Sequence, residues 1–228
     1  MRRALASAAL LALGGCTIPA REFGALAFHD PAFSGSQFNT WSCHTCHATR
    51  ADDPRILSGA PLVGVTERTG WYGGRANSLF EAVQFCYVAF MRGSKLEPEE
   101  GRSRALYEYL TTLKAKEPQA PFTFTVVGDV ADVPRGEKEL GGEVYKRACH
   151  DCHGALRSGA GANTTRATRL PDVFAEYPTL FPGVPPSLVV IEKVRHGQFF
   201  GVGGNMPLYS KEALSDEQLG ALLSYLEL

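Results

Sequence analysis

The sequence lacks an apolar segment long enough to cross a bilayer as a helix. Its longest candidate, residues 4–13, has ten residues, whereas a spanning helix needs ~20 apolar residues. An excess of one charge is also missing, because 23 lysines and arginines balance 24 aspartates and glutamates without a basic stripe. These absences argue against a transmembrane protein in the mature form and against a nucleic-acid partner.

The N-terminus has the layout of an export signal. Arg2 and Arg3 precede an apolar run that ends in small residues before Cys16. The sequence "LGGC" resembles the bacterial lipobox, in which the cysteine receives a diacylglyceryl group. We therefore expect residues 1–15 to be a lipoprotein signal peptide, with Cys16 as the lipid attachment site. The alternative is an ordinary cleaved signal with an incidental cysteine.

Cysteine is infrequent, and most of it lies in two short clusters. The segments "SCHTCHA" and "ACHDCHG" each place two cysteines three positions apart and a histidine directly after the second. With the lipid attachment site set aside, one cysteine has no assigned role. The six cysteines are Cys16, Cys43, Cys46, Cys86, Cys149 and Cys152.

Three kinds of site use such cysteine pairs: a redox dithiol, a zinc site and covalent haem c. A thioredoxin-like dithiol needs a βαβ context that the sequence does not suggest. Zinc needs four ligands together, whereas the two pairs lie 106 residues apart. Two thiols on one helical turn can bond two vinyl groups of a porphyrin, and the next histidine can reach its iron. Two copies behind an export signal favour covalent haem.

The two Cys-x-x-Cys-His motifs, each followed by a methionine 45 to 54 residues after its second cysteine, resemble two fused class I cytochrome c domains. The resemblance covers nearly all of the mature chain. It implies an all-α fold with two tandem cytochrome c domains, at residues 24–116 and 136–228, joined by an extended linker at 117–135. It implies two covalently bound haem c groups, held by Cys43, Cys46, Cys149 and Cys152, with His47 and His153 as iron ligands.

An internal repeat supports two domains in a chain of 228 residues. "ALYEYL" at 105–110 matches "ALLSYL" at 221–226 in four of six positions, and both have the apolar spacing of a helix. Ser215 and Gln218 predict a capping box for the second helix, and Pro98 marks the start of the first. A glycine precedes each first haem cysteine by eight residues, at Gly35 and Gly141. We expect these glycines, followed by Phe38 and Tyr145, at the crossing of the terminal helices.

The segment between the halves has three prolines, no helical period and the β-favouring run "FTFTVV". Flexible tethers are built from serine, glycine and charge, whereas this one carries Phe122 and Phe124. We therefore expect an extended strap that is docked on the domains and fixes the relation of the two haems.

The sixth ligand of each iron decides between an electron carrier and a catalyst. Met91 and Met206 lie 19 and 20 residues before the last leucine of the matched hexapeptides, so their positions are equivalent and we expect them to be the sixth ligands. A thioether favours ferrous iron and leaves no site for substrate. Met206 precedes Pro207 in a glycine-rich loop that is similar to the Met-Pro loop of the family. The alternative for either methionine is a core position.

Other side chains compete for the same role. Cys86 lies five residues before Met91, and a His/Cys iron is found in some dihaem cytochromes that oxidise thiosulfate. The simpler interpretation makes Cys86 a small buried apolar residue. His29 and His196 are further candidates, for which a surface or supporting role is favoured.

Three segments are expected to support the haems. The family resemblance implies that "SGAPLVGV", with Pro61 and Leu62, and the proline-rich residues 180–188 pack on the proximal histidines and offer a carbonyl to Nδ1. Trp71 and Tyr72, in "ERTGWYGGR", are expected to cap the first haem and exclude water.

These patterns lead to one functional expectation and several rivals. We expect a periplasmic dihaem cytochrome c, lipid-anchored to a bacterial membrane surface, that transfers single electrons between redox partner proteins. A rival interpretation makes the protein an electron-input subunit of a larger complex. The enzymatic alternatives are a thiosulfate-oxidising cytochrome with Cys86 on the iron and a cytochrome c peroxidase with a displaceable ligand.

Overall fold

The computed structural model describes residues 18–96, 101–117, 122–197 and 206–228. Within these ranges the protein is built of helices and loops, with one isolated antiparallel bridge between Trp71 and Ala76 and no strand. No helix of the described part is long and apolar enough to cross a membrane. The expectation of an all-helical fold is confirmed for these residues. The expected signal peptide, Cys16 and Pro98 lie outside them.

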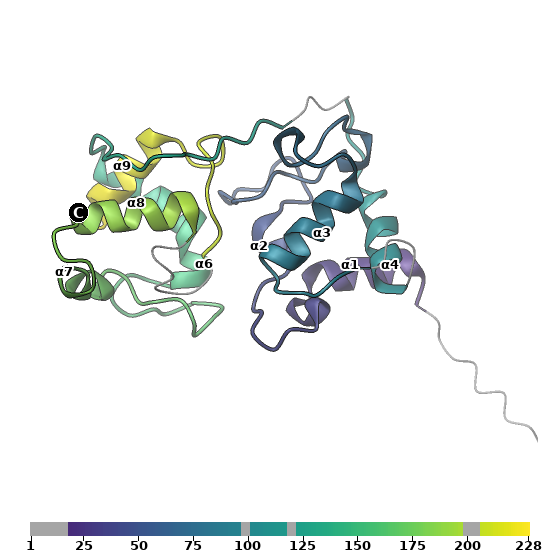
Figure 1. Cartoon of the computed structure of the whole chain (residues 1–228), viewed down its shortest axis with the longest axis horizontal. Coiled ribbons are helices and arrows are strands. Elements are labelled where there is room, and N and C mark those ends of the chain that lie inside the picture. Colours follow the sequence, from purple (N-terminus) through teal and green to yellow (C-terminus); the bar gives the residue numbers. More distant parts are fainter. Residues whose placement is uncertain (1–17, 97–100, 118–121, 198–205) are drawn as a thin grey trace, which may run out of the picture.

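The described residues of the N-terminal half form four α-helices and three short 3-10 helices. They are α1 (Ala20–His29), η1 (Pro31–Ser34), α2 (Cys43–Cys46), η2 (Val65–Glu67), η3 (Tyr72–Gly74), α3 (Leu79–Ala89) and α4 (Gly101–Leu110). Figure 1 shows them gathered on one side of the molecule. Their buried apolar side chains form one core that includes Phe28, Phe33, Tyr87, Met91 and Leu106.

In the C-terminal half, the part of the chain that the structure describes forms five α-helices, one π-helical turn and one 3-10 helix. They are α5 (Lys138–Val144), η4 (Tyr145–Cys149), α6 (His150–His153), η5 (Asp172–Glu176), α7 (Tyr177–Leu180), α8 (Pro186–His196) and α9 (Asp216–Tyr225). They lie on the other side of the molecule in Figure 1, around a second core. The expected capping box starts α9, since Ser215 and Gln218 bond each other's backbone N–H groups at 3.1 and 2.9 Å.

The same helix crossing occurs in both halves. Gly24 of α1 lies against Ala105 of α4, and a Cβ on this glycine would stand 1.9 Å from the Ala105 carbonyl oxygen. Gly141 of α5 lies against Ala221 of α9, with a corresponding distance of 2.0 Å. Both alanines open the matched hexapeptides of the sequence. Backbones can approach this closely only where a side chain is absent.

The prediction that Gly35 lies at the first of these crossings was wrong. Gly35 ends η1 with a φ of 70°, and a Cβ there would meet nothing within 4 Å. Phe38, its expected aromatic companion, is 60% exposed. The counterpart of Gly141 is Gly24, which lies 19 residues before the first haem cysteine rather than eight. Counting the same number of residues back from each motif does not find Gly24, because the first half has additional residues between the helix and the motif.

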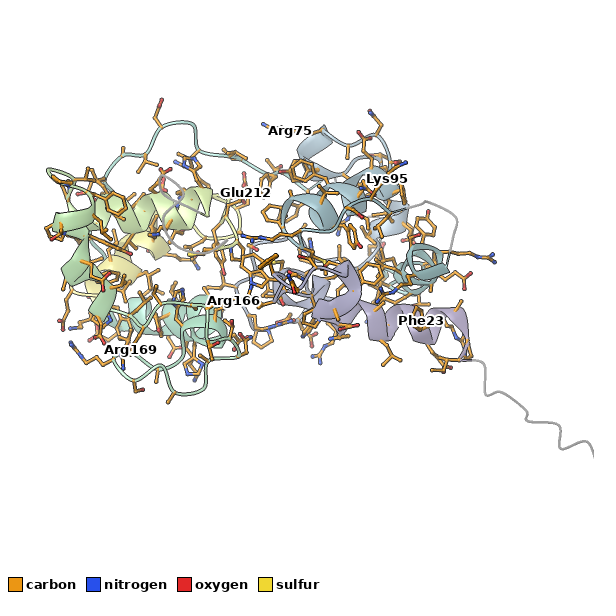
Figure 2. All side chains as sticks on the ribbon, turned by 60° about the horizontal axis from the view of Figure 1, so that its bottom comes forward. Phe23, Arg75, Lys95, Arg166, Arg169 and Glu212 are labelled. Carbon is orange, nitrogen blue, oxygen red and sulfur yellow. The ribbon has the colours of Figure 1, made fainter. Side chains whose placement is uncertain are left out.

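The two halves contact each other directly near the haem motifs. The Ile56 N–H donates to the Arg147 carbonyl at 2.9 Å, Arg147 Nε donates to the Pro54 carbonyl at 2.6 Å, and the Ile56 side chain belongs to the second core. Arg166 of the second half reaches the carbonyl of Phe38 and, at 3.3 Å, that of Gln37. Figure 2 shows Arg166 at this junction.

The strap between the halves is extended over its described residues, as expected. Phe124 stacks on Tyr72, with 5.7 Å between the ring centroids. The Thr125 N–H donates to Glu212 at 2.9 Å, and His196 of α8 reaches the Val127 carbonyl. The strap therefore docks on both halves, and Figure 1 shows it running across the top of the molecule.

Candidate functional site

The first Cys-x-x-Cys-His motif forms the single turn of α2. The Thr45 hydroxyl accepts a hydrogen bond from the Ser42 N–H at 3.1 Å and starts the turn. The His47 N–H donates to the Cys43 carbonyl at 2.9 Å and closes it. All cysteines of the described residues are free. The four residues of the turn thus present the two thiols, and His47 follows directly as an extended C-cap residue.

The ring of His47 is fixed from behind. Its Nδ1 lies 2.8 Å from the Ala60 carbonyl oxygen, and since a carbonyl only accepts, Nδ1 carries the hydrogen. Burial lowers the pKa of His47 and keeps the ring neutral. Nε2 is therefore left with its lone pair for a metal. The expected segment "SGAPLVGV" supplies this carbonyl.

Gly59 allows the loop to come this close to His47. A Cβ at Gly59 would stand 2.4 Å from Cε1 of the His47 ring. The Gly59 N–H also donates to the Cys46 carbonyl at 2.8 Å. The loop that orients the imidazole is thus tied to the haem motif itself.

An apolar cavity opens in front of the first motif, with an empty volume of about 1330 Å³ that extends to solvent. The thiols of Cys43 and Cys46 and the ring of His47 line it. Burial raises the pKa of the Cys43 thiol to about 12 and that of Cys46 to about 11. Two protonated thiols, one neutral imidazole and apolar walls are the donor set and surroundings that covalent haem c requires.

Both sulfur candidates for the far side of the iron line this cavity. Met91 follows α3 and is 5% exposed, and its N–H donates to the Cys86 carbonyl at 3.3 Å. Burial raises the pKa of the Cys86 thiol to about 12, and Cys46 adds to the effect. The fold brings Cys86 and Met91 to the same wall of the cavity, so both are candidate iron ligands.

The two residues expected to cap the first haem lie at the first cavity. Trp71 and Tyr72 line the cavity, and Trp71 Nε1 donates to the Val65 carbonyl at 2.9 Å. The Tyr72 ring lies 4.5 Å from that of Phe85. Aromatic side chains thus form part of the wall of the first site.

Four residues from outside the first half complete the cavity wall. Phe122 and Phe124 enter from the strap, and Pro207 and Leu208 enter from the second half. Their part in the first site was not predicted. The two phenylalanines could have been found from their apolar character in a polar linker. Nothing in the sequence marks Leu208.

The second motif begins in the π-helical turn η4 and ends in α6. The Tyr145 hydroxyl donates to the Gly154 carbonyl at 2.7 Å and closes the turn after the motif. Burial raises the pKa of Cys149 to about 12 and also raises that of Cys152. In the first half, by contrast, the two thiols of the motif lie on the isolated turn α2.

His153 is oriented in the same way as His47. Its Nδ1 lies 2.8 Å from the Thr168 carbonyl oxygen, and burial lowers its pKa. The expectation that residues 180–188 supply this carbonyl was wrong. Those residues form the end of α7, a turn and the start of α8, while the loop before η5 reaches the imidazole. Spacing alone could not place a loop whose path is set by packing.

Met206 is half-buried and packs against the second core. Its N–H donates to the Gly197 carbonyl at 3.1 Å, and a Cβ at Gly197 would stand 2.2 Å from the Met206 carbonyl oxygen. The glycine-rich residues before Met206 lie outside the described part of the chain. The backbone of Met206 is thus bound to the C-terminal end of α8.

The remaining histidines have other contacts. His196 lies between Glu192, at 2.9 Å from Nδ1, and the Val127 carbonyl, so both ring nitrogens have partners. The His29 ring packs on His44 with 4.3 Å between centroids. Within the described residues, no group of three or more histidine, cysteine, aspartate or glutamate side chains could hold a metal ion. The two cysteine pairs therefore do not form the four-ligand zinc site considered above.

The two motifs lie next to each other across the junction. Tyr209, which is buried, donates from its hydroxyl to the Ala148 carbonyl at 3.0 Å. Burial raises its pKa well above the ordinary value, and the charges of Cys149 and Cys46 add to the effect. One side chain is thus within electrostatic reach of cysteines from both motifs.

Comparison with known proteins gives a partial match. No curated protein matches the chain. Ten chains of solved structures do, among them a thiosulfate dehydrogenase (TsdBA) from Marichromatium purpuratum in its as-isolated form. That match has 17% identity and a TM-score of 0.41, and it covers 91% of this chain and 45% of the other, so the chain spans less than half of that protein's length. Residues 136–226 match the family model of cytochrome c oxidase, cbb3-type, subunit III, and this part of the chain is therefore a cytochrome c family domain.

Proposed function

We propose that the protein is a dihaem c-type cytochrome that transfers single electrons between redox partner proteins. The two domains are residues 24–116 and 136–228, joined by the strap at 117–135. The repeated crossing of Gly24 on Ala105 and Gly141 on Ala221 supports two copies of one fold. The family match of residues 136–226 supports the second copy directly.

The residues at each motif suit one covalently bound haem c. Two cysteines and one carbonyl-oriented histidine serve each group, and a methionine serves the far side of each iron. Haem bound in this way supplies reversible one-electron oxidation and reduction of iron. The chain holds the imidazoles neutral by burial and fixes their tautomer through Ala60 and Thr168. The proposed ligand sets are Cys43, Cys46, His47 and Met91, and Cys149, Cys152, His153 and Met206.

The adjacency of the two motifs carries the proposal of a relay. Pro207 and Leu208 directly follow the proposed ligand Met206 and line the cavity of the first motif. The bonds of Ile56 and Arg147 and the docked strap hold this arrangement. A fixed, close pair of redox sites is what stepwise transfer of electrons between two partners requires.

The site of action follows from the N-terminal sequence. We propose that Cys16 carries a lipid and holds the protein at a periplasmic membrane surface. Only one residue, Thr17, separates Cys16 from the first described residue, Ile18. The lipid would therefore keep the first domain close to the bilayer.

A second candidate function is supported by one observation, the position of Cys86 in the wall of the first cavity. A thiolate on the first iron would lower its potential and make the centre suited to oxidising a sulfur compound. Met91 on the same wall favours the carrier, since a neutral thioether needs no ionisation in a buried site.

Low-temperature EPR of the oxidised protein, together with mass spectrometry, tests these alternatives. The carrier predicts two haem additions on the polypeptide and two low-spin signals typical of His/Met iron. A His/Cys signal for the first iron would replace the carrier by the enzyme candidate. A product with fewer than two haems would refute the dihaem proposal.

A further inference from the structure

The end of α8 holds the chain at Met206 and again three residues after it. The Gly197 carbonyl accepts the Met206 N–H at 3.1 Å, and the Val194 carbonyl accepts the Tyr209 N–H at 2.8 Å. Two backbone bonds, three residues apart, thus tie the Met206 segment to the last turn of one helix. Whatever fixes this segment to α8 also fixes the position of the Met206 sulfur.

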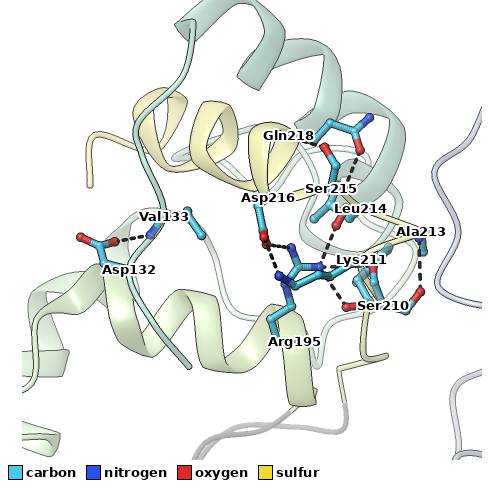
Figure 3. A network of polar contacts seen from close by, with 11 residues as sticks. Asp132, Val133, Arg195, Ser210, Lys211, Ala213, Leu214, Ser215, Asp216 and Gln218 are labelled. Carbon is cyan, nitrogen blue, oxygen red and sulfur yellow. Dashed lines mark hydrogen bonds and ion pairs between the residues drawn. The ribbon is translucent and has the colours of Figure 1, made fainter. Parts of the chain in front are cut away.

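Arg195 lies in the same helical turn and is 2% exposed. Its Nη1 donates to the carbonyls of Tyr209 and Ser210, each at 3.2 Å, and to that of Leu214 at 2.7 Å. Figure 3 shows the guanidinium at the centre of this network, between α8 and the start of α9. A single buried guanidinium therefore binds three backbone carbonyls of the segment that follows Met206.

Asp216 neutralises this cation. Its Oδ1 accepts from Arg195 Nη2 at 2.8 Å, while its Oδ2 accepts from Lys211 Nζ at 2.7 Å. The hydrogen bond from Lys211 lowers the pKa of Asp216, with Arg195 contributing, so the carboxylate stays ionised. Charged hydrogen bonds of this kind are short and directional, and they hold a fixed geometry better than apolar contacts do.

Around Met91, two bonds of the described residues are made by neutral groups. There the side-chain carbonyl of Gln84 accepts the Leu96 N–H at 2.8 Å, and the Tyr87 hydroxyl donates to the Ser34 carbonyl at 3.0 Å. Arg195 contacts none of these residues. The first centre is therefore a control within the same molecule.

We propose that Arg195 is a positioning residue for the second haem, which holds the Met206 thioether on the iron through the segment 209–214. The inference rests on the proposed function, in which Met206 ligates that iron. Arg195 itself touches neither the haem nor the sulfur in this role. Loss of its hydrogen bonds frees the segment, and the Met206 ligand is then displaced more easily.

The test uses the full-length holoprotein with Arg195→Gln, Arg195→Lys and Asp216→Asn. The readouts are the ferric absorption band of the thioether–iron bond, its loss during an alkaline titration, and the potential of each haem. In Arg195→Gln we expect the ratio of Met-displaced to Met-bound second haem to rise about tenfold or more, the effect of losing one charged hydrogen bond. The potential of the second haem falls and that of the first stays unchanged. Arg195→Lys and Asp216→Asn show smaller shifts in the same direction and guard against loss of folding in the first variant.

Arg169→Gln is the matched control, because this arginine lies in the same half and pairs with Asp172 at 3.0 Å but is 60% exposed. It should leave every readout unchanged. If the second haem of the wild type has the thioether band and keeps its potential and alkaline transition in all three variants, the inference is wrong and the proposed function stands. If the wild type has no such band from the second haem, the assignment of Met206 fails, and the inference fails with it.

Discussion

Gly141 lies against the backbone of Ala221 so closely that a Cβ on the glycine would stand 2.0 Å from the alanine carbonyl oxygen. The contact closes the second half at the crossing of α5 and α9, directly before the haem motif. Tyr145 and Tyr225 pack beside it, with ring centroids 5.7 Å apart.

Gly141→Ala should therefore destabilise the protein. The new methyl group meets backbone rather than a flexible side chain, so the helices must separate at a cost of about 2 kcal/mol or more. Thermal unfolding of the holoprotein measures the change. Gly128→Ala, where a Cβ would meet nothing within 4 Å, is the control. Equal effects of the two substitutions would argue against a close crossing.

Gly59→Ala should disturb the first haem alone. A Cβ at this position would stand 2.4 Å from the His47 ring, which must then turn or leave the Ala60 carbonyl. We expect altered EPR g values and a shifted potential for the first haem, with the second haem unchanged. Unaltered g values for the first haem would mean that Gly59 does not control the His47 ring.

Substitution of Met91 should change the ferric spectrum of the first haem, whereas substitution of Cys86 should not. Cys86→Ser is expected to leave both ferric spectra unchanged, because a buried thiol with a pKa of about 12 stays protonated at neutral pH. Met91→Leu keeps the packing volume but removes the thioether, and the first haem loses its share of the thioether band. The reverse pattern would identify Cys86 as the ligand and favour the enzyme candidate.

Phe124→Ala should open the first cavity to water. Phe124 is half-buried, lines the cavity and stacks on Tyr72, so its removal costs about 1 kcal/mol of stability and lowers the potential of the first haem. Phe38→Ala is the control, since Phe38 is 60% exposed and does not line the cavity. Potentiometric titration followed at each haem would detect the difference. No change in Phe124→Ala would exclude a role of this side chain in the first site.

His196 should make docking of the strap depend on pH. Burial lowers the pKa of His196, but the Val127 carbonyl and Glu192 outweigh this and raise it above 6.5. Only the imidazolium can donate both bonds. Its stabilisation is therefore complete below about pH 6.5 and is lost as the pH rises through the raised value. Unfolding midpoints from pH 5.5 to 8.5 should fall more in the wild type than in His196→Gln. Parallel curves would contradict this.

Much of the chemistry was predictable from short sequence spacing. The two cysteines of each motif are three positions apart and the histidine follows the second, so this spacing alone predicts that the three side chains lie together. The capping box of Ser215 and Gln218 and the extended strap are local in the same sense. The ligand roles of the motif residues, Met91 and Met206 remain predictions for the experiments above.

Tertiary structure decided which distant atoms meet. It placed Thr168 rather than residues 180–188 behind His153, Gly24 rather than Gly35 at the first crossing, and Leu208 of the second half in the wall of the first cavity. A backbone carbonyl looks the same at every position of a sequence, and the shape of a cavity depends on side chains from many segments. Short sequence spacing identified the cysteines and histidines that are proposed to bind haem. The packing of the two halves determined which side chains and carbonyls surround them.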